Sequence, residues 1–188
     1  MPTVEHVVRA VDGALKAIGF HRRGKSWTRR TGEFHHVVSL QVSKGGDSVT
    51  LNIGVFDRAC DQLCWGEGER SISDVNCIFA EKIGYFAGRT DVWWKLDNGD
   101  TPAIVVNALQ RQAIPVFERL TTREAVADAL EQQPDFGSGY ALPRIYLACL
   151  KALLGDRTEA LRLLSDIETA GGEWAKRAAD VEKRIGEA

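Results

Sequence analysis

The sequence predicts an α+β fold in which an N-terminal helix packs on an antiparallel sheet of four or five strands and more helices follow. Three observations support this. Apolar residues near the N-terminus recur with helical spacing, the middle of the chain alternates between apolar and polar residues, and helical spacing returns after Thr101. With 44% hydrophobic and 27% charged residues among 188, the chain should bury roughly 70% of its unfolded surface.

The first helix is predicted from an apolar stripe that runs from Val4 to Ile18. Thr3 is a suitable N-cap, and Gly19 is a suitable residue to end the helix. A short polar strand over residues 27–30 follows.

A β-hairpin is predicted next, because residues 34–43 and 48–56 alternate in polarity on either side of Gly45-Gly46. If Lys44 pairs with Asp47, one face of the hairpin is apolar and the other is polar in its middle. The pairs on the apolar face are Val42 with Val49, Leu40 with Leu51 and Val38 with Ile53. The pairs on the polar face are Ser43 with Ser48, Gln41 with Thr50 and Ser39 with Asn52.

The pattern beyond the hairpin is weaker. We expect residues 57–74 to form a long loop, with or without a short helix, and residues 75–82 and 91–96 to form strands. Residues 97–100 have the composition of a turn.

The remaining chain is predicted to be helical. Thr101 is the expected N-cap of a helix with Pro102 at its first position, and Pro115 is expected to kink or break that helix. Residues 121–124 form a capping box that opens a short helix to about residue 131.

Two regions are therefore expected. Residues 1–133 form an α+β domain, and residues 133–139 are the best linker candidate. Residues 140–188 form a helical extension of two or three helices, which should pack on the domain because its apolar stripes are short. Part of this extension looks like one tetratricopeptide-type hairpin in a single copy.

No catalytic residue, cofactor or metal is assigned. The cysteines at positions 60, 64 and 77 could begin a zinc site, completed by His21, His35 or Cys149, but their spacing is not a standard one. Whether Cys60, Cys64 and Cys77 bind metal stays open. Signatures of nucleotide binding, metalloproteases and serine hydrolases are absent from the sequence, so a binding function is favoured over an enzymatic one.

The chain start lacks the basic and apolar segments of a secretory signal, and no apolar run is long enough to span a membrane. We therefore expect a cytoplasmic protein without a membrane partner.

The favoured hypothesis is a non-catalytic binding or protein-interaction module that uses the polar face of the sheet, with an unknown protein or small molecule as partner. Gly54 should leave room there for a ligand or another chain. One of the two adjacent tryptophans could line one side of the site, although the sequence does not decide which of them is exposed. The proposed binding residues are His35, Ser39, Gln41, Thr50, Asn52, Trp93 and Trp94.

The alternative hypothesis is that the basic segment between residues 22 and 30 binds nucleic acid or phosphate. The same charges would also suit a solvated edge strand. A net charge of −2 for the chain makes nucleic acid the less favoured partner. The residues of this segment are Arg22, Arg23, Lys25, Arg29 and Arg30.

Several short motifs occur in an order typical of one family. They are Gly19-Phe20, the basic stretch with Gly24 and Trp27, Val37-Val38-Ser39-Leu40-Gln41, Asn52-Ile53-Gly54-Val55, Cys77, Ile83-Gly84, Trp93-Trp94-Lys95-Leu96-Asp97 and Pro115-Val116-Phe117-Glu118-Arg119-Leu120. Together they resemble the bacterial domain-of-unknown-function family 4304 over about residues 4–130. The resemblance implies a bacterial, cytoplasmic α+β domain and implies no catalytic residues.

Overall fold

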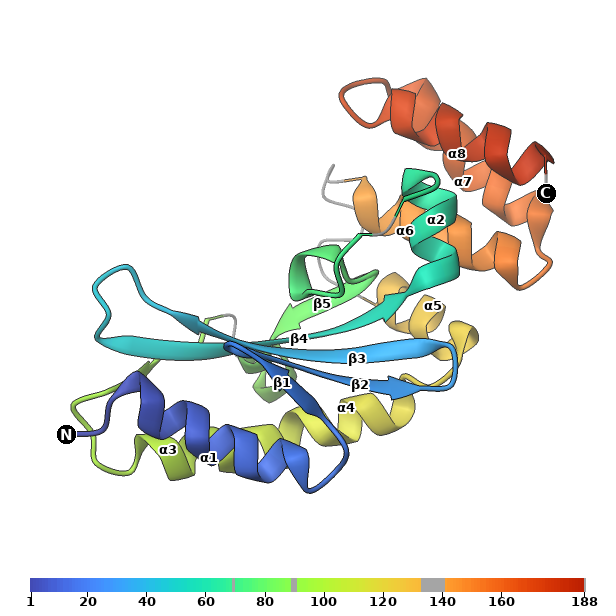
Figure 1. Cartoon of the computed structure of the whole chain (residues 1–188). Helices are drawn as coiled ribbons and strands as arrows, with labels where there is room; N and C mark the ends of the chain where they lie inside the picture. The colour runs from blue at the N-terminus through green and yellow to red at the C-terminus, as the bar shows by residue number, and fades with distance from the viewer. Residues whose placement is uncertain (69, 89–90, 133–140, 188) are drawn as a thin grey trace. The chain divides into compact units, whose positions relative to one another are not determined.

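The computed structural model describes residues 1–68, 70–88, 91–132 and 141–187 (Figure 1). The chain divides into two compact units. Unit 1 comprises Met1–Phe56 and Ile72–Arg119, and unit 2 comprises Asp57–Ser71 and Leu120–Ala188. The predicted extension thus shares a unit with residues 57–71, and its packing on the α+β domain stays a prediction. The predicted linker at 133–139 lies outside the described residues.

Unit 1 is built on a six-stranded sheet in which β1 to β5 follow one another in space and β6 pairs with β4. The fold class predicted from the sequence is confirmed. The two strands predicted over residues 75–82 and 91–96 are shorter in the structure. Residues 74–76 form a short 3-10 helix, η1 (Asp74–Asn76), and the last strand has only two residues. The strands are β1 (His21–Arg23), β2 (Ser26–Thr31), β3 (Phe34–Val42), β4 (Ser48–Asp57), β5 (Phe79–Lys82) and β6 (Trp94–Lys95).

The register of the β3–β4 hairpin agrees with the predicted one. The backbone N–H of Ser43 donates to the carbonyl of Ser48 at 2.9 Å, as expected if these residues are directly opposite each other. Extended along both strands, this register places Ser39 opposite Asn52.

One face of the sheet packs on α1 (Val4–Lys16), α3 (Thr101–Ala108) and α4 (Ile114–Arg119) (Figure 1). Trp27 is fully buried there, and its Nε1–H donates to Asp12 Oδ1 on α1 at 2.8 Å. The buried indole N–H is therefore satisfied, and the contact fixes α1 against β2.

The helix predicted with Thr101 as its N-cap and a kink or break at Pro115 differs from the prediction at both places. Asp100 is the N-cap of α3, so Thr101 already belongs to the first turn. A π-helix, η3 (Leu109–Ala113), joins α3 to α4 in place of a break. Pro115 cannot donate a backbone hydrogen bond, and the N–H of Ile114 just before it reaches back to the Leu109 carbonyl.

Residues 72–78 lie against the opposite face of the sheet. A Cβ at Gly54 would stand 2.6 Å from Cys77 Sγ, so the room expected for a ligand at Gly54 is filled by this segment of the chain itself. Cys77 also packs with Val37, Phe56 and Ile72 in one cluster. A second 3-10 helix, η2 (Ile83–Ala87), follows β5.

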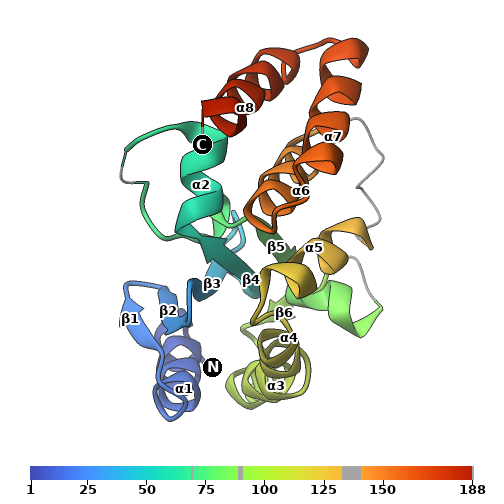
Figure 2. The same cartoon turned by 90° about the vertical axis from the view of Figure 1, so that its right-hand side faces the viewer.

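Unit 2 is helical (Figure 2). The N-cap residues Thr122 and Asp156 accept hydrogen bonds from the backbone N–H groups of Ala125 and Glu159. The capping box predicted over residues 121–124 is thus displaced by one residue, because Thr122 caps the helix in place of Thr121. Its helices are α2 (Arg58–Trp65), α5 (Arg123–Glu131), α6 (Leu142–Leu153), α7 (Arg157–Ala170) and α8 (Ala175–Glu187). In the part of the chain that the structure describes, no helix has the length and apolar character needed to cross a membrane.

Candidate functional site

A row of polar side chains crosses the sheet on the face opposite α1. Residues directly opposite each other on paired strands share a face, and Trp27 points toward α1, so its neighbour Ser26 points away. From β1 to β5 the row consists of Arg23, Ser26, Ser39, Asn52 and Lys82. We call this set the polar row.

Asp74 on η1 binds the centre of the polar row. Its Oδ2 accepts a 2.6 Å hydrogen bond from Ser39 Oγ and a 3.1 Å bond from Asn52 Nδ2. The Asn52 amide also donates to Gln41 Oε1 at 3.4 Å. The Asp74 carboxylate can only accept, so it fixes the orientation of the Asn52 amide.

No sequence motif singles out Asp74, which lies where a long loop is expected to end. The contact depends on a tertiary arrangement. Cys77 Sγ donates to the Ser73 carbonyl at 3.4 Å and packs against Gly54, and this arrangement holds η1 over the sheet.

An open depression of about 570 Å³ lies at the β5 end of the polar row. Lys82 Nζ pairs with Asp91 Oδ1 at 2.6 Å and lies 5.3 Å from the centre of the Trp93 ring. This hydrogen bond lowers the pKa of Asp91. Val75 at the rim is 81% exposed. The lining residues are Asn52, Asp74, Val75, Ala80, Glu81, Lys82 and Asp91. We call this set the acidic depression, because it contains three acidic residues and one lysine.

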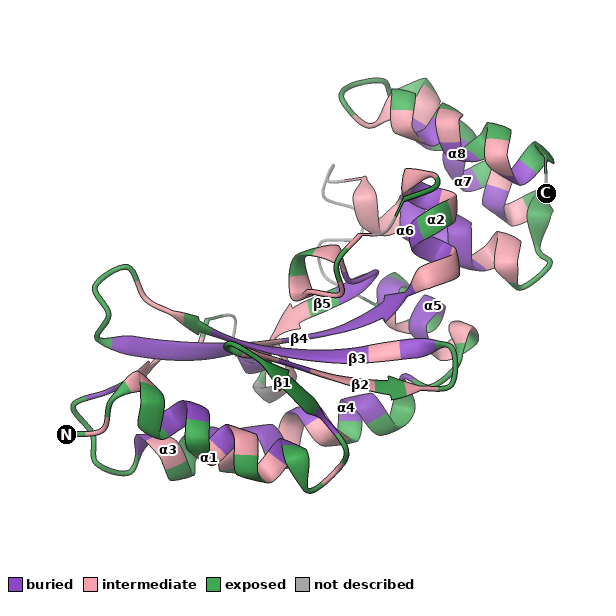
Figure 3. Cartoon of the chain, in the orientation of Figure 1, coloured by how far each residue is buried: buried purple, intermediate pink, exposed green. Residues whose placement is uncertain are grey.

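The other end of the row carries positive charge. Arg22, Arg23 and Lys25 are exposed around β1, which Figure 3 shows in green, and none of them has an ion-pair partner among the described residues. We call these three residues the basic edge.

The rest of the predicted basic segment has internal contacts. Arg29 donates to the Ile18 carbonyl at 3.2 Å, and its guanidinium lies 4.9 Å from the centre of the Phe20 ring. Arg30 Nε donates to the Gly32 carbonyl at 3.3 Å. The guanidinium of Arg29 thus contributes to the packing of unit 1, and that of Arg30 binds the backbone of the following turn.

The structure brings only part of the predicted polar site together. Ser39, Gln41 and Asn52 are linked through Asp74 or to each other, and Trp93 stands beyond Lys82. The remaining predicted residues have other surroundings.

Thr50 is fully buried, and its hydroxyl has no hydrogen-bond partner in the described part of the chain. His35 packs edge-on against Phe56 at 6.3 Å. Trp94 lines a separate cavity of about 620 Å³ with Ile104. Alternation predicted which face each side chain takes, but not what covers it.

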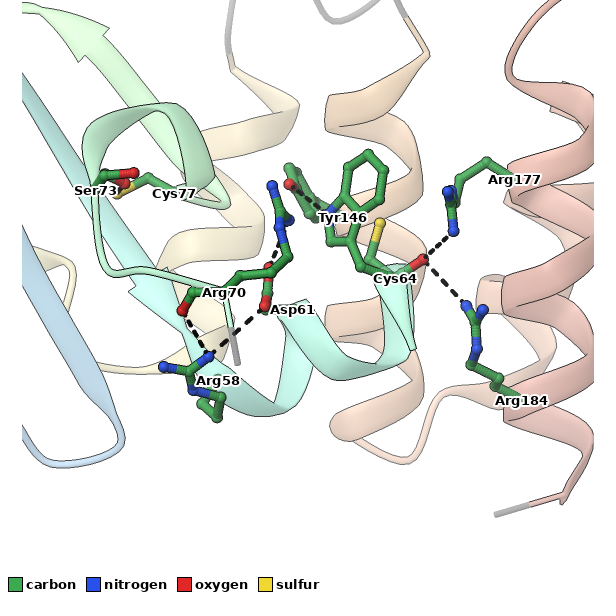
Figure 4. A network of polar contacts seen from close by, with 10 residues as sticks. Arg58, Asp61, Cys64, Arg70, Ser73, Cys77, Tyr146, Arg177 and Arg184 are labelled. Carbon is green, nitrogen blue, oxygen red and sulfur yellow. Dashed lines mark hydrogen bonds and ion pairs between the residues drawn. The ribbon is translucent and has the colours of Figure 1, made fainter. Parts of the chain in front are cut away.

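The polar contacts of unit 2 stabilise its own helices (Figure 4). Arg70 pairs with the buried Asp61 at 2.7 Å, and Arg184 donates to the carbonyls of Leu63 and Cys64 at the end of α2. Cations at this end also complement the helix dipole.

Three of the cysteines, Cys60, Cys64 and Cys149, are buried in unit 2, whereas Cys77 belongs to unit 1. Burial raises the pKa of the Cys60 and Cys77 thiols. Within the described ranges no group of three or more His, Cys, Asp or Glu side chains is placed to hold a metal ion.

Comparison with known proteins gives one match. The model of a family described as a domain of unknown function, DUF4304, matches residues 11–119, more than half of the chain. The match falls within the region predicted from the sequence motifs. No curated protein and no solved structure gives a significant match.

Proposed function

The chain belongs to the DUF4304 family, a domain of unknown function, and we propose that its unit 1 is a protein-interaction module that binds a cationic surface of a partner. The binding site is the acidic depression on the polar face of the sheet. The observation that carries this proposal is the position of Asn52, which belongs to the polar row, binds Asp74 and lines the depression.

Hydrogen bonding favours a partner that donates. The side-chain N–H groups of Asn52 donate to Asp74 and Gln41, so the side-chain carbonyl oxygen of Asn52 remains as an acceptor. Lys82, the cation of the depression, is paired with Asp91. An arginine or lysine side chain of a partner supplies both the donors and the charge that this surface needs.

The shape of the site favours a protein surface over a small molecule. Small-molecule sites are mostly enclosed and apolar, whereas this depression is open and lined by charged groups. The exposed Val75 at its rim adds an apolar contact of the kind found at protein interfaces.

Fluorescence anisotropy with a labelled nine-residue peptide of alternating arginine and serine tests this proposal. We expect saturable binding, and no binding of matched peptides with glutamate or glutamine in place of arginine. Asp91→Asn should weaken binding by about tenfold, since one charge-assisted contact is worth about 1.4 kcal/mol or more.

Asp128→Asn in unit 2 is the matched control, because it removes the same charge from an exposed carboxylate outside the site. Equal binding of all three peptides, or equal effects of the two substitutions, would contradict the proposal.

A further inference from the structure

We infer that a second site in unit 1, the cavity of about 620 Å³ beside Trp94, binds an uncharged planar heterocycle of the purine type. Val92 and Trp94 line this cavity from one side, and Ile104, Asn107 and Gln112 line it from α3 and η3. We call it the Trp94 cavity. It shares no lining residue with the acidic depression, so the inference goes beyond the proposed function and is independent of it.

The Trp94 cavity lies on the side of the sheet that the helices cover. Trp94 is directly opposite Val49 on β4, so the two side chains share a face of the sheet. Val49 is fully buried on the apolar face of the hairpin, which packs on the helices. The neighbouring Trp93 takes the other face and lies beside Lys82. The two tryptophans therefore belong to different surroundings.

Both sides of the Trp94 cavity are held by contacts within unit 1. The hydroxyl of Thr101, in the first turn of α3, donates to the Lys95 carbonyl on β6. On the opposite side η2 packs closely against Val92, since a Cβ on Gly84 would stand 2.8 Å from Val92 Cγ2. A site whose sides are already held in place is largely preformed, which lowers the entropic cost of binding a rigid ligand.

The π-helix η3 explains how two carboxamides reach the same cavity. Asn107 and Gln112 are five residues apart, a spacing that would turn their side chains about 140° away from each other on an α-helix. The N–H of Ile114 bonds to the Leu109 carbonyl five residues earlier, so the helix is wider in the turn that contains Gln112. Both residues line the cavity as a result. Such π-helical turns occur frequently at functional sites.

The two carboxamides are available to a ligand. In the part of the chain that the structure describes, neither Asn107 nor Gln112 has a side-chain hydrogen-bond partner. Each carboxamide has an acceptor oxygen and two donor hydrogens, so it can make a paired contact with a ligand edge that carries one donor and one acceptor. The N6 amine and N7 of adenine form such an edge, and Asn and Gln side chains bind it in this way.

The rest of the lining favours a ring without charge. Trp94 is partly exposed and offers an indole face on which a planar base can stack. Ile104 is 39% exposed, which is high for a large apolar side chain, and a bound ring would cover it. The described residues that line the cavity carry no charge, so none of them would neutralise a phosphate or a carboxylate. The volume of the cavity lies within the range of small-molecule sites.

Isothermal titration calorimetry with adenosine tests the inference. We expect saturable binding of adenosine by the wild-type chain. Purine riboside has the same rings but lacks the exocyclic amine, and it should bind at least about tenfold more weakly because the paired contact is lost. Adenosine 5′-monophosphate should bind no more tightly than adenosine.

Three substitutions remove the contacts one at a time. Asn107→Leu, Gln112→Leu and Trp94→Leu should each weaken adenosine binding by about tenfold, through the loss of a carboxamide or of the stacking surface. Gln110→Leu is the matched control, because Gln110 is an exposed glutamine of the same π-helix that does not line the cavity. Thermal melting followed by circular dichroism should show that Gln112→Leu and Gln110→Leu are folded alike.

An absence of adenosine binding to the wild type, equal affinities for adenosine and purine riboside, or equal effects of Gln110→Leu and Gln112→Leu would each overturn the inference. Binding of the monophosphate more than about tenfold tighter than adenosine would also overturn it, since the site would then recognise an anion. The arginine–serine peptide contacts none of these residues in the proposed function, so its binding is measured separately and can succeed or fail on its own.

Discussion

The amide nitrogen of Asn52 lies 3.1 Å from the carboxylate of Asp74, a residue 22 positions later in the chain. The same carboxylate oxygen accepts from Ser39 on the neighbouring strand. This contact ties η1 to β3 and β4, and it places the acidic depression at the β5 end of the polar row. The stability of unit 1 and the shape of its proposed binding site therefore depend on the same carboxylate.

Replacing Asp74 by alanine should lower the free energy of unfolding by about 2 kcal/mol, because the buried Ser39 hydroxyl and the Asn52 amide lose their acceptor. Urea denaturation followed by circular dichroism measures this change. Asp74→Asn keeps one acceptor oxygen and should cost less. Equal losses in the two variants would show that the hydrogen bonds do not stabilise the fold.

Gly54→Ala should destabilise unit 1 by about 1–3 kcal/mol, because the new Cβ would stand 2.6 Å from Cys77 Sγ and 2.9 Å from the Phe79 carbonyl. Gly99→Ala is the control, since no atom outside its immediate neighbours lies within 4 Å of a Cβ there. In a double-mutant cycle, Cys77→Ala should recover part of the loss. An unchanged melting temperature for Gly54→Ala would contradict the close approach of η1 to the sheet.

Arg123→Met should cost about 3 kcal/mol. Arg123 Nε donates to Asp57 Oδ2 at 2.7 Å, and the Asp57 side chain is only 1% exposed. Removal of the guanidinium leaves a buried carboxylate held by the backbone N–H groups at the start of α2. Chemical denaturation beside Arg119→Met, which changes an exposed arginine, isolates the effect of the pair. A loss no larger than that of the control would mean that the pair adds nothing to stability.

The stability of unit 2 should depend on Glu168 and pH. Burial and the nearby Glu182 carboxylate raise the pKa of Glu168 above its ordinary value of 4.5. The folded state then favours the protonated form, so this contribution is present in acid and is lost as pH rises from near 4.5 through the raised value.

Glu168→Gln should therefore raise the melting temperature slightly at pH 7 and leave it nearly unchanged at pH 4. Glu173→Gln, on the same unit, should show no such difference. A destabilised Glu168→Gln at pH 7 would reverse the assigned sign.

Local periodicity was sufficient to predict the elements that bury a regular face. The stripe from Val4 to Ile18 gave α1, and strict alternation around Gly45-Gly46 gave the β3–β4 register. The three residues of β1 were missed, because such a short polar run has no period. Its existence depends on pairing with β2.

The candidate site was predicted only in part, because its key contacts join distant segments. Alternation placed Ser39, Gln41 and Asn52 on one face, and the structure links them. Asp74 could not be anticipated, since its role follows from the packing of Cys77 against Gly54. Thr50 was assigned to the open surface, but the sequence pattern gave no information about what would bury it.

The most direct test of the proposed function is a nuclear magnetic resonance titration of ¹⁵N-labelled protein with the arginine–serine peptide. We expect shifts of the Asn52 side-chain amide and of backbone amides at residues 74–75, 80–82 and 91, which line or adjoin the acidic depression. Shifts confined to other surfaces, or none at saturating peptide, would contradict the claim that the polar face of the sheet binds a cationic partner.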